Sequence, residues 1–127
     1  MILVDTSIWI RCLSNRPPYT DLLNTLLFSG DVVGHELVYG ELLIGDLAVQ
    51  ERAGRAKFLA SYEKIHQSRK VPHADVVAFV RNRKLHGRGV GWIDIHLLAS
   101  ALVEGHRLWT ADPRLAVIAR ELGVGWK

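Results

Sequence analysis

The sequence predicts one α/β domain in which helices flank a central, mainly parallel sheet. Short apolar runs alternate with longer segments of helical periodicity, which is the order of parallel strands joined by helices. The 127 residues suit one domain, and we assign residues 1–127 to it. Hydrophobic residues make up 49% of the chain and charged residues 23%, a composition that can bury a core and argues against disorder.

In the first part of the chain, the pattern predicts a strand, two helices, a strand and a helix. An apolar run over residues 2–4 indicates a buried strand, and the short helix after it must end before the proline pair at 17–18. A leucine-rich helix then ends at Gly30. Residues 31–34 indicate a second strand, and residues 37–45 suit a helix.

The remaining part of the chain adds four helices and two strands to the prediction. Helical spacing is clearest after Trp92, where Ile93, Leu97, Leu98 and Ala101 form one apolar stripe. Residues 66–71 fit neither pattern. The predicted helices cover residues 49–62, 74–85, 92–103 and 115–122, and the predicted strands cover residues 107–110 and 124–126.

Several classes of protein are disfavoured by simple features of the chain. Cys12 is the only cysteine, which excludes a disulfide framework and a cysteine-rich zinc site and favours a reducing cytoplasm. No apolar run approaches the roughly 20 residues of a membrane span. The first ten residues lack a basic stretch and contain an acid, so we expect no secretory signal and no contact with a membrane.

Basic residues are concentrated in the middle of the chain. Residues 50–90 contain ten lysines and arginines against three acids, a local charge of about +7, whereas the rest of the chain is about −4. This distribution favours a polyanionic partner, although a solvated helical surface would have the same composition. The candidates for holding a nucleic-acid backbone are Arg81, Arg83, Lys84 and Arg88.

Three acidic residues lie where an α/β sheet usually places its site, at the carboxyl end of a strand or the start of the next helix. Asp5 directly follows the first strand, Asp112 lies just after the strand at 107–110, and Asp94 opens a helix. Glu41 is a fourth candidate. It lies among apolar residues in the middle of a helix, a poor place for an unpaired charge.

Converging carboxylates repel one another unless a cation lies between them. Oxygen ligands without cysteine suit Mg²⁺ or Mn²⁺ rather than zinc. Such an ion could polarise a phosphodiester and lower the pKa of an attacking water. Each acid also has a structural alternative: Asp5, Asp94 and Asp112 could cap helices, and Glu41 could pair with an arginine.

The four acidic motifs, in this order and at these spacings, resemble those of the PIN-domain nucleases. More narrowly, they resemble the VapC-type toxins of bacterial toxin–antitoxin pairs, and the resemblance covers almost the whole chain. The matching segments are MILVDTSIW at 1–9, ELLIG at 41–45, GVGWID at 89–94 with HLLA at 96–99, and LWTAD at 108–112. Leu115 stands where many relatives carry phenylalanine, a difference that we expect to affect packing only.

The resemblance implies a PIN-like fold and a metal-dependent endoribonuclease that hydrolyses phosphodiester bonds of tRNA or rRNA in the cytoplasm and so blocks translation. Asp5, Glu41, Asp94 and Asp112 would be the catalytic residues and the ligands of Mg²⁺ or Mn²⁺. The resemblance also implies a homodimer that is silenced by a VapB-like antitoxin and contacts DNA only through that antitoxin.

We expect the C-terminal segment of the antitoxin to be amphipathic. Its apolar residues would lie in a groove between the predicted helices at 37–45 and 49–62, with a basic residue reaching Asp5, Glu41 or Asp94. A charge-assisted pair of this kind would exclude substrate phosphate from the carboxylates.

Several polar and aromatic residues lie close to the acids in the sequence. Thr6, Ser7 and Thr110 could support the acids through hydrogen bonds or could be ordinary turn hydroxyls. His96 is two residues from Asp94 and should face another side of the helix, so we expect it to be a packing or surface residue. Three tryptophans, at positions 9, 92 and 109, could stack on bases, although core filling is the alternative that we favour.

The sequence leaves two functions open. One is a ribonuclease, and the other is a nucleic-acid-binding or regulatory subunit that acts with a DNA-binding partner and in which the acids hold a structural ion. A phosphatase with an aspartyl nucleophile is disfavoured because it needs a second aspartate two residues after the first, and position 7 is Ser7. The glycine-rich segment at 87–91 lacks the lysine and hydroxyl of a phosphate-binding loop and indicates a turn.

Overall fold

The computed structural model describes residues 1–45 and 52–126, with residues 52 and 53 described by their backbone only. Within these residues, four strands form one parallel sheet in the order β3-β2-β1-β4. The strands are β1 (Ile2–Val4), β2 (Val32–His35), β3 (Gln67–Ser68) and β4 (Arg107–Trp109). Leu3 of β1 pairs with Val33 on one side and Leu108 on the other. The predicted α/β fold with a parallel sheet is confirmed.

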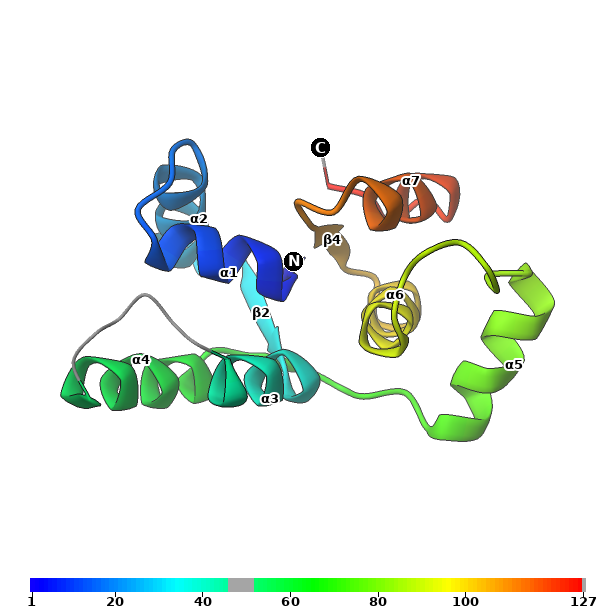
Figure 1. Cartoon of the computed structure of the whole chain (residues 1–127), viewed down its shortest axis with the longest axis horizontal. Coiled ribbons are helices and arrows are strands. Elements are labelled where there is room, and N and C mark those ends of the chain that lie inside the picture. Colours follow the sequence, from blue (N-terminus) through cyan, green and yellow to red (C-terminus); the bar gives the residue numbers. More distant parts are fainter. Residues whose placement is uncertain (46–51, 127) are drawn as a thin grey trace.

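Seven helices of the described residues surround this sheet (Figure 1). They are α1 (Thr6–Leu13), α2 (Tyr19–Phe28), α3 (Glu36–Ile44), α4 (Arg52–Lys64), α5 (His73–Arg83), α6 (Trp92–Glu104) and α7 (Pro113–Glu121). α1 packs on α2, α3 packs on α4 and β2, and α6 packs on α5, β3 and β4. In Figure 1, α4 and α5 lie at opposite ends of the molecule, with α6 between them. No helix in the described part of the chain is long and apolar enough to cross a membrane.

The core is built around β1 and α6. Leu3 and Val4 are fully buried because β1 lies inside the sheet, between β2 and β4. α6 is buried at every residue from Ile95 to Ala101, because the sheet and α5 cover it on several sides. A helix that is apolar almost all round suits such a position. The first turn of α6, which carries Asp94, is therefore attached to the most buried helix of the described chain.

Three segments differ most from the prediction, and the bounds of the other elements shift by one or two residues. The predicted helix at 49–62 corresponds to α4, which begins at Arg52, and residues 49–51 lie outside the described residues. The ambiguous segment at 66–71 contributes the two-residue strand β3, which pairs with Gly34 and His35 of β2. The predicted strand at 124–126 is reduced to a single bridge between Gly125 and Leu108.

At the carboxyl edge of the sheet, strands pass directly into helices. Asp5 separates β1 from α1, His35 ends β2 and caps α3, and Asp112 follows β4 and caps α7. Because the strands are parallel, these junctions share one edge of the sheet, where α/β proteins usually bind their ligands.

Candidate active site

Asp5 lies at the centre of the carboxyl edge and is held by two hydroxyl groups. Its side chain is only 5% exposed. Although Asp5 occupies the N-cap position of α1, its carboxylate accepts no capping hydrogen bond from that helix. Instead, the hydroxyls of Ser7 (2.8 Å) and Thr110 (2.7 Å) both donate to Oδ2 of Asp5. The helix-cap alternative for Asp5 is therefore wrong.

The same two hydroxyls connect α1 to the turn between β4 and α7. The Ser7 hydroxyl accepts a hydrogen bond from the backbone N–H of Ala111 (3.1 Å), and the Thr110 hydroxyl accepts one from the N–H of Asp112 (3.0 Å). Each hydroxyl thus accepts one hydrogen bond from a backbone N–H and donates one hydrogen bond to Asp5. This arrangement fixes the orientation of the Asp5 carboxylate.

Glu41 is anchored by Thr6, the residue after Asp5. The Thr6 hydroxyl donates to Oε1 of Glu41 at 2.6 Å, a contact that joins α1 to α3. In the described residues, ion pairs join Arg69 to Glu104 and Arg88 to Glu121, and none involves Glu41. The alternative in which Glu41 pairs with an arginine is not found there.

Asp112 is the N-cap residue of α7, as its structural alternative predicted, whereas Asp94 is not the N-cap of α6 but lies three residues after the N-cap Gly91 and bonds back to it. Oδ2 of Asp94 accepts from the N–H of Gly91 (3.1 Å), which is the half of a capping box that a glycine N-cap allows, and Oδ1 of Asp112 accepts from the N–H of Arg114 (2.9 Å). In each case the hydrogen bond occupies one carboxylate oxygen. The second oxygen has no hydrogen bond within the described chain.

The pKa of Asp94 responds to burial and to the other three predicted acids. The pKa of Asp94 is raised to about 6, chiefly by burial and against the lowering effect of the Gly91 N–H. The negative charges of Asp5, Glu41 and Asp112 each contribute to this rise. Asp5, Glu41 and Asp112, from three other parts of the chain, therefore lie within electrostatic range of Asp94.

A divalent cation fits the chemistry of these residues. No lysine or arginine of the described chain forms an ion pair with any of the four acids, so their mutual repulsion is uncompensated there. Their donors are carboxylate oxygens, which suit Mg²⁺ or Mn²⁺. Among residues 1–45 and 52–126, no group of three or more acidic, histidine or cysteine side chains forms a ready metal site. Binding would require the side chains to move closer together.

The four basic residues predicted to bind RNA differ in whether their side chains are exposed or paired with an acid. Arg81, Arg83 and Lys84 are exposed at the C-terminal end of α5. The guanidinium of Arg88 instead forms two hydrogen bonds to the carboxylate of Glu121, at 2.6 and 2.9 Å. Arg88 would have to leave that partner to reach a nucleic acid.

Arg11 is a cation on α1, bonded to the backbone of Ser7, that the sequence analysis missed. Its guanidinium donates to the carbonyl oxygen of Ser7 (3.2 Å) and lies 5.5 Å from the centre of the Tyr19 ring. The sequence signal was its position four residues after Ser7, on the same face of α1.

The three tryptophans divide between core and surface. Trp9 and Trp109 are 4% and 5% exposed and pack against other aromatic rings, so for these two the core-filling prediction is confirmed. Trp92 is 45% exposed and contacts the rings of His73 and His96. His96 is itself buried, in agreement with a packing role.

Comparison with known proteins agrees with this geometry. The sequence profile of the PIN domain matches residues 2–121. The chain is 41% identical over 126 residues to the protein named Ribonuclease VapC32 from two strains of Mycobacterium tuberculosis. The match covers 98% of this chain and 94% of each relative. The chain therefore belongs to the PIN domain family and is a homologue of a VapC ribonuclease.

Proposed function

We propose that this protein is a Mg²⁺- or Mn²⁺-dependent endoribonuclease and the toxin of a VapBC-type toxin–antitoxin pair. One observation carries the proposal. Each of Asp5, Glu41, Asp94 and Asp112 is anchored through one carboxylate oxygen, and the other oxygen has no hydrogen bond in the described chain. Four carboxylates arranged in this way suit one-oxygen ligation of a cation.

In this proposal the residues divide into ligands and supports. Asp5, Glu41, Asp94 and Asp112 hold the metal, Ser7 and Thr110 orient Asp5, and Thr6 orients Glu41. When bound, Mg²⁺ or Mn²⁺ would polarise the phosphodiester and lower the pKa of water. The hydrogen-bonded oxygens of the acids fix their side chains, the other oxygens would hold the ion, and burial of Asp5 limits its solvation.

The substrate is cellular RNA, tRNA or rRNA, and its cleavage stops translation in the cytoplasm. The exposed basic residues Arg81, Arg83 and Lys84 contact the RNA backbone, with a smaller contribution from Arg88 because of its pairing with Glu121. In this proposal the protein acts as a homodimer. Its protein partner is a VapB-like antitoxin, and it contacts DNA only through that antitoxin.

The experiment is incubation of the purified protein with total RNA in Mg²⁺, in Mn²⁺ and in EDTA. Endonucleolytic fragments that appear only with metal support the proposal. The matched control is Asp5→Asn, purified in the same way, which keeps the size of the side chain and removes its charge. RNA binding without cleavage by the unsubstituted protein would favour the alternative, a nucleic-acid-binding subunit without relevant turnover.

A further inference from the structure

His35 is a buried histidine whose two ring nitrogens are both used. The residue is fully buried at the junction of β2 and α3. Its Nδ1 accepts a hydrogen bond from the backbone N–H of Leu37 (3.1 Å) and so caps α3. Burial lowers the pKa of His35 to about 4, so the ring is neutral at physiological pH. Since Nδ1 is an acceptor, the ring proton is on Nε2.

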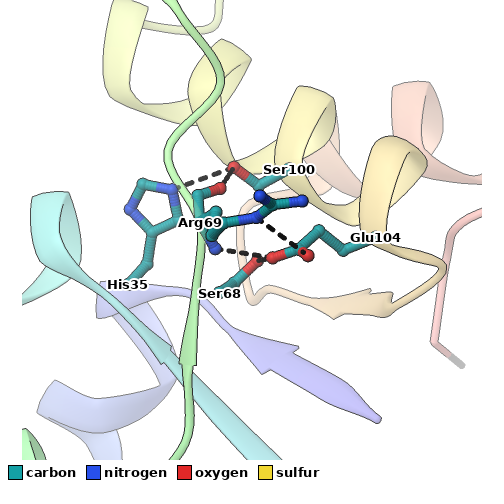
Figure 2. A network of polar contacts seen from close by, with 5 residues as sticks. All are labelled: His35, Ser68, Arg69, Ser100 and Glu104. Atoms are coloured by element: carbon teal, nitrogen blue, oxygen red, sulfur yellow. Dashed lines mark hydrogen bonds and ion pairs between the residues drawn. The ribbon is translucent and has the colours of Figure 1, made fainter.

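The Nε2–H of His35 points to Ser100 in the middle of α6. It donates to the Ser100 hydroxyl at 3.0 Å, and that hydroxyl donates to the carbonyl oxygen of Arg69 at 2.8 Å (Figure 2). Ser100 is also fully buried. His35 therefore links the start of α3 to α6 through a chain in which each donor has one acceptor.

The two linked helices carry two of the proposed metal ligands. Glu41 lies six residues after His35 on α3, and Asp94 lies six residues before Ser100 on α6. At a rise of 1.5 Å per residue, each acid is about 9 Å along its helix from this link. α3 otherwise packs mainly on α4 and β2, and α6 on α5, β3 and β4. The hydrogen bond is thus a direct connection between the N-cap of α3 and the middle of α6.

We propose that His35 is a positioning residue, which sets the separation of Glu41 and Asp94 through its hydrogen bond to Ser100 and so sets the affinity of the site for a divalent cation. This inference rests on the proposed function, because it assumes that the two acids hold a metal. The charges of Glu41 and Asp94 repel, and a buried hydrogen bond holds only over a narrow range of distances. Mg²⁺ and Mn²⁺ demand short, regular distances to their ligands, so a loosened pair would bind more weakly.

The test uses two amides that each replace one nitrogen of the ring. In His35→Asn the amide occupies the place of Nδ1, so it can cap α3 but cannot reach Ser100. In His35→Gln the amide reaches the place of Nε2, so it can donate to Ser100 but loses the cap. We expect Mn²⁺, measured by the EPR signal of the free ion, to bind about 10-fold more weakly to His35→Asn. His35→Gln should stay within about 3-fold of the unsubstituted protein, although its Tm falls by roughly 4 °C.

Two serine variants separate positioning from general stability. Ser100→Ala removes the acceptor of His35 and should weaken Mn²⁺ binding as His35→Asn does, and the double variant should be no weaker than either. Ser68→Ala is the matched control, since Ser68 is also a buried serine bonded to α6, through Glu104 (3.1 Å), but its hydroxyl is not part of the chain from His35 to Ser100 (Figure 2). It should lose stability and keep its Mn²⁺ affinity.

Equal Mn²⁺ affinity in His35→Asn and the unsubstituted protein would overturn the inference. So would a loss in His35→Gln or Ser68→Ala as large as that in His35→Asn, because the loss would then follow stability alone. If the unsubstituted protein binds no Mn²⁺, the proposed function itself fails and this inference fails with it.

Discussion

Replacement of Asp94 by asparagine should stabilise the metal-free protein. The pKa of Asp94 is raised from 3.8 to about 6, and at about 1.4 kcal/mol per pKa unit the full equivalent is about 3 kcal/mol. Because Asp94 is only half-buried, solvent screening reduces this to about 1–2 kcal/mol. Asparagine keeps an oxygen that can accept from the Gly91 N–H, so the cap of α6 should survive. For a domain of this size the variant should melt about 4–8 °C higher.

The pH dependence of this gain follows from the direction of the shift. A raised carboxyl pKa means that ionisation of Asp94 costs more in the folded state than in the unfolded state. Below the unfolded value of 3.8 both states carry the proton, and the side chain costs nothing. The cost grows as pH rises from 3.8 towards about 6 and is fully present above that. Asparagine never ionises, so its advantage should follow the same curve.

The assay is thermal unfolding in EDTA from about pH 4 to about pH 8, with Asp75→Asn as the control. Asp75 is also in the first turn of a helix, α5, but is exposed. Added Mn²⁺ should reverse the order, since an ion at 100 times its Kd stabilises the protein that binds it by about 2.7 kcal/mol. A difference in Tm that is constant over this pH range, or a metal-free variant that melts lower at neutral pH, would refute the reasoning.

Four further predictions concern activity and binding. Asp5→Ala should abolish RNA cleavage and growth arrest without lowering the metal-free Tm; full activity with a Tm several degrees lower would instead make Asp5 a structural residue. Cleavage should stop in EDTA and return with Mg²⁺ or Mn²⁺, and undiminished activity after thorough chelation would contradict metal dependence. Changing Arg81, Arg83 and Lys84 together to glutamine should weaken RNA binding and flatten its salt dependence, with the single-turnover rate at saturating RNA nearly unchanged; an unaltered salt slope would show that these charges do not contact RNA. Antitoxin variants whose C-terminal arginines and lysines are changed to glutamine should inhibit less, and equal inhibition would point to blocking of the groove or the dimer.

The sequence predicted the larger elements because their signals are local. The apolar run of β1 and the stripe of α6 are each visible within one short segment. β3 was not predicted because a two-residue edge strand has no periodicity of its own. It is defined by its pairing with Gly34 and His35, more than 30 residues away. The length of such a strand is set by its hydrogen bonds to the neighbouring strand in the folded sheet, which the local sequence does not show.

The identity of the four acids could be predicted, but their anchoring could not. Thr110 is 105 residues from Asp5, and Ser100 is 65 residues from His35. Such contacts depend on the register of the sheet and the placement of α6. The pairing of Arg88 with Glu121, 33 residues away, was hidden for the same reason, so the sequence overstated the free charge of the basic segment.

For Asp94 and Asp112, the structural and functional interpretations are not alternatives. A carboxylate has two oxygens, and in each of these residues one oxygen caps a helix while the other has no hydrogen bond in the described chain. The cap holds the side chain at the first turn of a helix, where the positive end of the helix dipole also favours a negative charge. Asp5 shows the other solution, since hydroxyls rather than a helix end hold its carboxylate. An asparagine at position 94 therefore separates the two roles, because an amide oxygen can still cap the helix but supplies no charge to a cation.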